Sequence, residues 1–441
     1  MSQLTTRKLQ VGPYVGAVPR RLLPASWPIW AAFVMLPLWW ALGVAGVAAI
    51  AIALPMLASL LFRRRLSAPK GFGIWLAFLL WCALSATQVD GPRQAFSLGY
   101  RMSLYVAATA FFLYVVNTPK HELPTSSVVR ALGAFWVVAV VGGIVGMLLP
   151  GFSFTTPTQA LLPRDLLDDR FIHDLVSAST TSLRAFAAYP IHRQKAPFAY
   201  TNEWGATFAV TLPFAIASLA YAKTKLSRDL KALLLIASVF PLVFSLDRGA
   251  WLSACGGLAY AALRLAKGRN AQLVKALAVG ALAIGILMFV TPLGEIVATR
   301  LTNGYGDARR AELYRQSIEL VRESPVFGHG APVLVEGSIS AGTHGQLWTV
   351  LVSQGVPGLV FFVGFLAWAL WRASRKLPPG HPGDGHARLW CEVAILIAVL
   401  QSPYYDLLPW GLPIVMAAAG LAWREMREPL PAVAGRARPR A

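Results

Sequence analysis

The sequence predicts an all-α membrane protein of about twelve transmembrane helices, forming a single transmembrane domain over residues 1–441. Two observations lead to this prediction. Hydrophobic residues make up 56% of the chain and charged residues only 14%, and long apolar runs recur from Trp27 to Trp423. A hydrocarbon core roughly 30 Å thick is crossed by about 20 apolar residues of helix, which is the approximate length of these runs. The bilayer is therefore the solvent in which we expect this chain to fold.

The expected spans are apolar stretches separated by charged loops or by turns that contain Gly and Pro. They lie near residues 26–42, 43–62, 71–88, 97–116, 128–149, 204–222, 232–246, 250–266, 274–292, 346–371, 389–402 and 408–423. An even number of spans places both termini on the same side of the membrane.

Lysine and arginine concentrate in alternate connections, as the positive-inside rule describes for cytoplasmic loops. These connections contain Arg63, Arg64, Arg65, Lys70, Lys120, Lys223, Lys225, Arg228, Lys231, Arg264, Lys267, Arg269, Lys275, Arg372, Arg375, Lys376 and Arg388. We therefore expect a multi-pass protein with both termini in the cytoplasm. The formal charge of +20 reflects these topogenic residues and contacts with membrane lipids, so we expect no nucleic-acid partner.

Two connections, residues 150–203 and 293–345, are much longer than the others, and we expect both to be large exterior loops that carry function. The second contains DARRAELYRQSIELVRES, in which Ala311, Tyr314, Ile318 and Val321 form an apolar stripe at helical spacing. This pattern predicts an interfacial amphipathic helix, with a plain solvated surface helix as the alternative. The Pro- and Gly-containing segment 424–441 is expected to be a mobile cytoplasmic tail.

Cations also remain in the exterior segments, where the topogenic bias disfavours them. They are Arg93, Arg101, Arg164, Arg170, Arg184, Arg193, Lys195, Arg248, Arg300, Arg309, Arg310, Arg315 and Arg322. Arg193 and Lys195 precede the span that starts at Trp204, and Arg248 lies in the tight turn LDRGAW between two spans. Because a guanidinium fork suits a pair of phosphate oxygens, we predict a diphosphate clamp here. The alternatives are an ion pair between Arg248 and Asp247, and a solvated loop position for Arg193.

Of the seven histidines, His173, His192, His329 and His344 fall in exterior segments. His344 ends the second long loop, directly before the apolar run of GTHGQLWTVLVSQGVPGL. A histidine at the mouth of a membrane-facing cleft can act as a general base, although a lone histidine is more often structural. His344 is therefore the first catalytic candidate and His329, in FGHGAP, is the second.

The chain contains no P-loop, no GxGxxG after a strand, no HExxH, no Cys/His cluster and no GxSxG elbow. The pair Asp168-Asp169 lacks convergent partners, and we interpret it as a solvated charge or a helix cap. We therefore expect no cofactor and no metal site.

At several of these positions the chain resembles the O-antigen ligase and O-antigen polymerase superfamily of bacterial inner-membrane glycosyltransferases. The resemblance covers most of the region from about Arg193 to Gly358. It rests on a loop arginine followed by Asn202 in AYTNEWGATFAV, the Arg-Gly pair of SLDRGAWLSACGG, Arg310 with an aromatic residue four positions later, the ESPVFGHG turn, and His344 with GVPGL downstream. Members of the superfamily commonly have His-Asn and Trp where this chain has His344-Gly345 and Tyr314.

The resemblance implies a glycosyltransferase C-type fold and transfer of a polysaccharide from undecaprenyl diphosphate to a sugar of the lipid A core. The reaction takes place on the periplasmic face of the inner membrane without metal or ATP. In this reading His344 and Arg248 are catalytic and the transfer inverts the anomeric centre. The residues expected to bind the donor are Arg193, Lys195, Asn202, Arg248 and Arg310. The alternatives are an O-antigen polymerase of the same superfamily and, from another class, a transporter of lipid-linked glycan.

Overall fold

The computed structural model describes residues 23–63, 66–186, 189–267, 271–291, 293–302, 307–333, 344–377, 381 and 383–427, and most of them are helical. Within these ranges, four helices are long and apolar enough to cross a membrane. They are α5 (Pro92–Asn117), α6 (Thr125–Leu148), α10 (Thr201–Ala220) and α17 (Gln346–Ser374). A mostly helical chain with several membrane-type helices is thus confirmed, whereas the number twelve stays a prediction.

Helices also occupy the other segments that we expected to span the membrane. They are α1 (Trp27–Phe33), α2 (Leu36–Leu42), α3 (Ala45–Leu61), α4 (Phe72–Leu84) with the 3-10 turn η1 (Ser85–Gln88), α11 (Lys225–Ala237), α12 (Val239–Phe244), α13 (Arg248–Lys267), α14 (Ala271–Val290), α18 (Gly385–Gln401) and α19 (Gly411–Arg427). Two expected spans are broken: residues 26–42 form α1 and α2, and residues 232–246 form α11 and α12. Pro37 and Pro241 lie in the first turn of the second helix of each pair, where a missing backbone N–H interrupts the helical hydrogen bonds.

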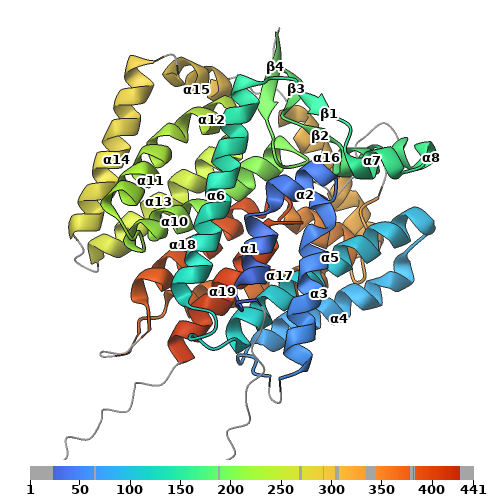
Figure 1. Ribbon diagram of the computed structural model, residues 1–441. Helices are drawn as coiled ribbons and strands as arrows, with labels where there is room; N and C mark the ends of the chain where they lie inside the picture. Colours follow the sequence, from blue (N-terminus) through green and yellow to red (C-terminus); the bar gives the residue numbers. More distant parts are fainter. Residues whose placement is uncertain are drawn as a thin grey trace, which may run out of the picture.

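The connection between α6 and α10 contains short strands, and here the structure departs from the all-α prediction. It contains β1 (Ser153–Phe154), α7 (Pro157–Leu161), α8 (Arg164–Leu167), α9 (Arg170–Val176), β2 (Ala178–Ser179), β3 (Thr181–Phe186) and β4 (Tyr189–Gln194). β1 pairs with β2 and β3 pairs with β4, both antiparallel. Pairing of strands within this one connection satisfies the backbone polar groups of these residues without a helix. The strands lie with α7 and α8 at one end of the helical bundle (Figure 1).

The connection between α14 and α17 contains α15 (Leu293–Thr302) and α16 (Asp307–Glu323). α16 packs against α17, and its most buried side chains are Leu313 and Ser317, whereas Ile318 is 42% exposed. The predicted stripe that included Ile318 is therefore displaced by about one position, because α17 covers the neighbouring face of the helix. On the open face, Arg315 forms ion pairs with Glu312 and Glu319.

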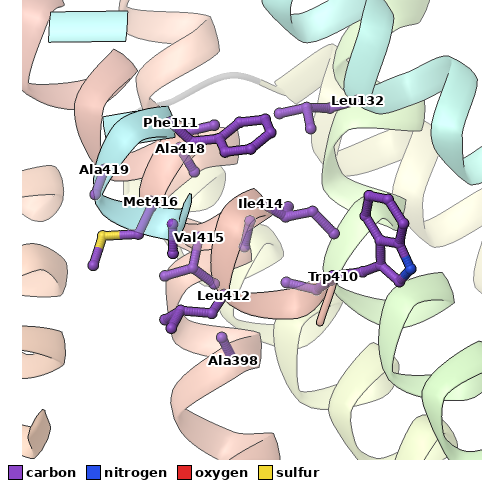
Figure 2. Packing of buried hydrophobic residues seen from close by; sticks show 14 of the residues in the cluster. Phe111, Leu132, Ala398, Trp410, Leu412, Ile414, Val415, Met416, Ala418 and Ala419 are labelled. Carbon is purple, nitrogen blue, oxygen red and sulfur yellow. The ribbon is translucent and has the colours of Figure 1, made fainter. Parts of the chain in front are cut away.

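The hydrophobic core surrounds α19, which packs against α5 and α18. Leu412, Ile414, Val415 and Met416 are completely buried, and Figure 2 shows them between the neighbouring helices. A helix that is apolar on all sides fits such a buried position. α19 also contacts α17 and α10, so it lies within the core that these helices share.

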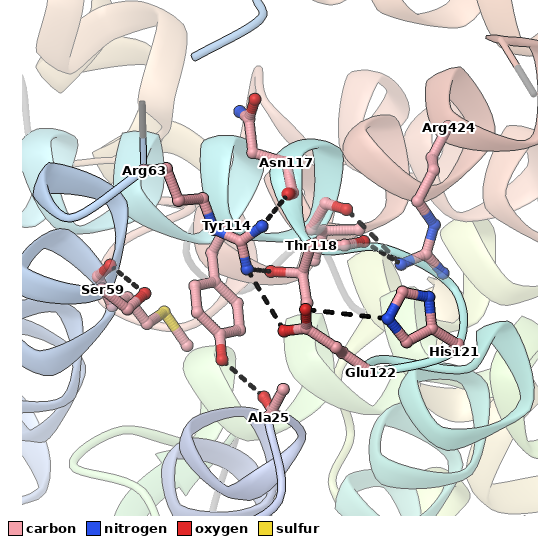
Figure 3. Close-up of polar contacts among 11 residues, drawn as sticks. Ala25, Ser59, Arg63, Tyr114, Asn117, Thr118, His121, Glu122 and Arg424 are labelled. Atoms are coloured by element: carbon pink, nitrogen blue, oxygen red, sulfur yellow. Dashed lines mark hydrogen bonds and ion pairs between the residues drawn. The ribbon is translucent and has the colours of Figure 1, made fainter. Parts of the chain in front are cut away.

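Charged side chains bind backbone groups at the opposite end of the bundle from the strands (Figure 3). The Arg63 guanidinium donates to Asn117 O at 2.6 Å, and Arg424 donates to Thr118 O at 3.2 Å. Arg424 is only 4% exposed and belongs to α19, which ends at Arg427. The first four residues of the predicted tail 424–441 are thus helical, because the ends of α5 and α19 share these hydrogen bonds. Residues 428–441 lie outside the described residues.

The connections sort into two groups by their contacts. At the end shown in Figure 3, Lys120 pairs with the buried Glu425 at 2.9 Å, and Glu425 also accepts a hydrogen bond from Asp384 N at 2.8 Å. At the other end, Arg101 pairs with Asp406 at 2.8 Å. At the first end, connections predicted to lie on one side of the membrane therefore contact one another; at the second end, α5 contacts the connection that contains Asp406. The side itself remains a prediction.

Candidate functional site

The tight turn before α13 fixes the position of Arg248, the first residue of that helix. Leu246 has a φ of +52°, a left-handed backbone conformation that costs free energy for a branched side chain. Leu246 and Asp247 are only 6% and 5% exposed. The surrounding packing thus holds this strained turn, with Asp247 buried and Arg248 at the start of α13.

Asp247 joins this turn to two distant parts of the chain. The Tyr405 hydroxyl donates a hydrogen bond to Asp247 Oδ1. On α10, a Cβ atom at Gly205 would lie 2.5 Å from Asp247 Oδ2, so only glycine allows this close approach. Burial and the Asp247 carboxylate raise the pKa of Tyr405 well above its usual value. Tyr405 therefore stays protonated and remains a hydrogen-bond donor.

Residues 402–410, which we call the α18–α19 loop, also hold the residues that follow His344. Gln346 N donates to Tyr405 O at 2.8 Å, and the Gln346 side-chain oxygen accepts from Leu407 N at 3.0 Å. A Cβ atom at Gly345 would clash with Pro403 O, so the chain lies directly against the loop here. His344 itself is partly buried. The loop that binds Asp247 through Tyr405 thus also positions the segment next to His344.

A cleft of about 400 Å³ opens beside Arg248. Its walls are formed by Arg248, Gly249, Leu252, Ala311, Tyr314, Tyr404 and Tyr405. These residues come from α13, α16 and the α18–α19 loop, so the cleft lies where three distant segments meet. It combines a guanidinium with aromatic and aliphatic walls, which suits a ligand that carries both an anionic group and an apolar surface.

Arg193 lies on β4 and binds the same turn that precedes Arg248. Its Nε donates to Ser245 O at 2.6 Å. Its positive charge also acts on Tyr405, where it opposes the rise in pKa. The structure therefore brings Arg193 and Arg248, which are far apart in sequence, to one turn.

The other predicted donor-binding residues have different surroundings. Lys195 is 7% exposed, and its Nζ donates to Ala199 O at 3.1 Å in the turn before α10. Burial lowers the pKa of Lys195, and the nearby charges of Asp174 and Glu203 oppose that change. Asn202 is exposed in the first turn of α10. None of Arg193, Lys195 and Asn202 is among the described residues that line the cleft.

Arg310 belongs to α16, but its side chain lies outside the part of the chain that the structure describes. Tyr314, one turn further along α16, lines the cleft. The predicted contact of Arg310 with the donor therefore stays a prediction.

His329 has contacts that account for it structurally. Its Nε2 is 2.9 Å from Leu320 O, and its backbone N donates to Val352 O at 2.9 Å. If Nε2 donates to Leu320 O, Nδ1 is the ring nitrogen that could accept a proton. The order of His344 before His329 as catalytic candidate stays a prediction.

The ESPVFGHG turn and the GVPGL segment pack on each other. Gly355 has a φ of +66° inside α17, and this kink exposes backbone groups that the turn binds. Val356 N donates to Pro325 O at 2.8 Å, and a Cβ atom at Gly355 would lie 2.6 Å from that same oxygen. The two motifs therefore form one structural unit between α16 and α17.

The sequence reasoning missed the tyrosines of the α18–α19 loop. Tyr404 donates to or accepts from Ser253 Oγ at 2.8 Å, Tyr405 binds Asp247, and Asp406 pairs with Arg101. The available signal was the polar run YYD in an exterior turn between two apolar spans.

Asp169, one of the two adjacent aspartates, lies directly before α9. Asp169 caps α9 by accepting from Phe171 N at 2.9 Å, and it also pairs with Arg93 at 3.0 Å. In the described ranges, no three His, Cys, Asp or Glu side chains come together in a way that could hold a metal ion.

Part of the chain that contains this site matches a known protein family. Residues 232–363 match the family described as O-antigen ligase, and this range includes the Arg248 turn, α16 and His344. This match supports a member of the O-antigen ligase superfamily. Together with the apolar helices, it suggests a membrane protein of the glycosyltransferase-like kind found in O-antigen pathways. A search of curated proteins finds no match to the chain.

Tyr405→Phe should lower the free energy of unfolding by about 1.5–3 kcal/mol, because it removes a buried hydrogen bond to a carboxylate. Tyr404→Phe is the matched control: it loses a bond to the neutral Ser253 hydroxyl and should cost only about 0.5–1.5 kcal/mol. Unfolding of the purified protein in detergent measures both. Equal losses would mean that the bond from Tyr405 to Asp247 stabilises the protein no more than the bond between Tyr404 and Ser253.

Proposed function

We propose that this protein is an O-antigen ligase, which transfers a polysaccharide from undecaprenyl diphosphate to a sugar of the lipid A core on the periplasmic face of the bacterial inner membrane. One observation carries the proposal. Arg193 and Arg248 meet at a single turn beside a cleft, and the loop that forms one wall of this cleft also holds the segment after His344.

The donor follows from the chemistry of the compartment. Nucleotide sugars are absent outside the cytoplasm, so a transferase there needs a donor that is already activated and attached to the membrane. A lipid diphosphate meets both needs, and it requires neither a metal ion nor ATP because the bond to be broken is itself activated.

The cations act on the leaving group. As the anomeric carbon separates from the diphosphate, negative charge grows on the phosphate oxygens, and Arg193 and Arg248 stabilise it. Arg310 adds a further cation from α16. Lys195 lies in the turn before α10 and Asn202 in its first turn, and Lys195 contributes through its charge, since its ammonium already donates to Ala199 O.

His344 acts on the acceptor. A core sugar hydroxyl must lose a proton as it attacks the anomeric carbon, and His344 takes that proton as general base. The diphosphate leaves from the opposite face of the carbon, so the transfer inverts the configuration. Membrane lipids surround the site, and both substrates reach it from the outer half of the bilayer.

The deciding experiment uses the full chain in proteoliposomes, with undecaprenyl diphosphate-linked glycan and purified lipid A core. Ligase activity gives core lipid of increased mass. Longer glycan on the carrier, with unmodified core, would indicate a polymerase instead. Movement of the donor across the bilayer without any new glycosidic bond would indicate a transporter.

The topology has its own test. Tags at Met1 and Ala441 should be protected inside intact inner-membrane spheroplasts, whereas cysteines introduced near Asp168 and Gly304 should react with an impermeant maleimide. Cys82, Cys255 and Cys391 are replaced first, and a cysteine at Ser227, in a lysine-rich connection, is the matched control that should not react. Labelling at Ser227 or external access to either terminus would contradict the topology.

A further inference from the structure

Tyr314 stands out among the residues of the Arg248 cleft. It comes from α16, and its ring stacks on Trp348 of α17 with the centroids 4.7 Å apart and an angle of 18° between the planes. It is also part of the cleft wall. One face of the ring is therefore covered by a large neighbour that restrains its orientation.

The other tyrosines of the cleft are engaged through their hydroxyls. Tyr405 is 4% exposed and donates to Asp247, and the Tyr404 hydroxyl lies 2.8 Å from Ser253 Oγ. These bonds tie the α18–α19 loop to α13 and explain both side chains without a ligand. Tyr314 contributes an aromatic surface from the opposite segment, α16.

The rest of the lining indicates what such a surface could bind. Leu252 and Ala311 add apolar area, and Arg248 adds a positive charge in the same volume of about 400 Å³. One face of a pyranose ring carries C–H groups, whose hydrogens are slightly positive and match the negative face of an aromatic ring. A pyranose next to a phosphate therefore satisfies both kinds of wall.

We propose that Tyr314 is a stacking platform for the pyranose attached directly to the donor diphosphate, so that the cleft recognises the first sugar as well as the phosphates. The ligand class is a pyranosyl lipid diphosphate. This inference rests on the proposed function, because it assigns a sugar subsite to the same donor site. It gives α16 a binding role in addition to its packing against α17.

The test compares two lipids: a polyprenyl diphosphate, and the same lipid carrying one pyranose. Binding of each to the full chain in nanodiscs is measured by microscale thermophoresis. The wild type should bind the glycosylated lipid more tightly. Tyr314→Leu keeps apolar volume against Trp348 but removes the aromatic face, so it should weaken binding of the glycosylated lipid about 3- to 10-fold and leave the bare lipid unchanged.

Two further variants complete the design. Tyr314→Phe retains the ring and should retain the preference for the glycosylated lipid. Ile318→Ala lies on the same helix at a position that is 42% exposed and does not line the cleft, so it should change neither affinity. If Tyr314 only attaches α16 to α17, Tyr314→Leu will lower the unfolding temperature and leave the ratio of the two affinities unchanged, which overturns the platform.

The outcomes also separate this inference from the proposed function. Equal wild-type affinity for the two lipids overturns the sugar platform but leaves the diphosphate site intact. Failure of the wild type to bind either lipid overturns both.

Discussion

His344→Ala should lower the rate of glycan transfer by roughly 10²- to 10⁴-fold, which is the usual contribution of a general base. The acceptor hydroxyl must lose a proton during attack, and the variant has no group at this position to take it. Binding of the lipid diphosphate should be retained, because Arg193 and Arg248 remain at the turn before α13. Single-turnover transfer to lipid A core measures the rate, and binding of undecaprenyl diphosphate is measured separately.

The separate measurements matter because His344 is partly buried and precedes the residues that attach α17 to the α18–α19 loop. His344→Gln keeps a polar side chain of similar reach and should show the same loss of rate. His173→Ala is the matched control, since the His173 side chain is 47% exposed on α9. Transfer at the wild-type rate by His344→Ala, or an equal loss in His173→Ala, would rule out this role.

Arg248→Lys should lose most of the transfer activity while the protein remains inserted and abundant. A lysine keeps the charge but presents a compact ammonium, which lacks the planar fork that binds two phosphate oxygens at once. Arg248→Ala should lower the rate of glycan transfer about 10²- to 10³-fold, which is comparable to the effect of removing one group that stabilises a developing negative charge. The assay is the same single-turnover transfer, with the affinity for undecaprenyl diphosphate measured alongside it.

Arg322→Lys provides the control for charge on α16, which forms another wall of the cleft. Arg322 is exposed near the end of α16 and does not line the cleft, so its exchange should leave transfer unchanged. A fully active Arg248→Ala variant would contradict the diphosphate clamp, whatever the result for His344.

The candidate site was predictable only in part. The guanidinium chemistry of Arg193 and Arg248 was evident from the sequence, because both cations fall in segments that the sequence predicts to be exterior. Their meeting at one turn depends on the hydrogen bond from Arg193 Nε to Ser245 O, which joins β4 to the residues before α13. Lys195 precedes α10 just as Arg193 does, yet it is buried and binds Ala199 O. β4 ends at Gln194, so Arg193 lies on the strand whereas Lys195 lies in the turn that follows it.

Local physical chemistry accounts for what the sequence by itself determined. Apolar runs long enough for a bilayer predict helices wherever they occur, since every backbone polar group must be satisfied within the segment. The chain therefore specified its helical, membrane-type character, the placement of its long connections, and its resemblance to the superfamily that residues 232–363 match.

Only the tertiary structure decided which of these elements form the site. The cleft at Arg248 needs Tyr314 from α16 and Tyr404 and Tyr405 from the loop before α19. No periodicity relates these positions, because they lie on separate elements and meet through packing. The contact of Tyr405 with Asp247 adds a buried hydrogen bond between segments that are far apart in sequence. Such long-range contacts depend on how all the helices pack together, which the local pattern of residues does not specify.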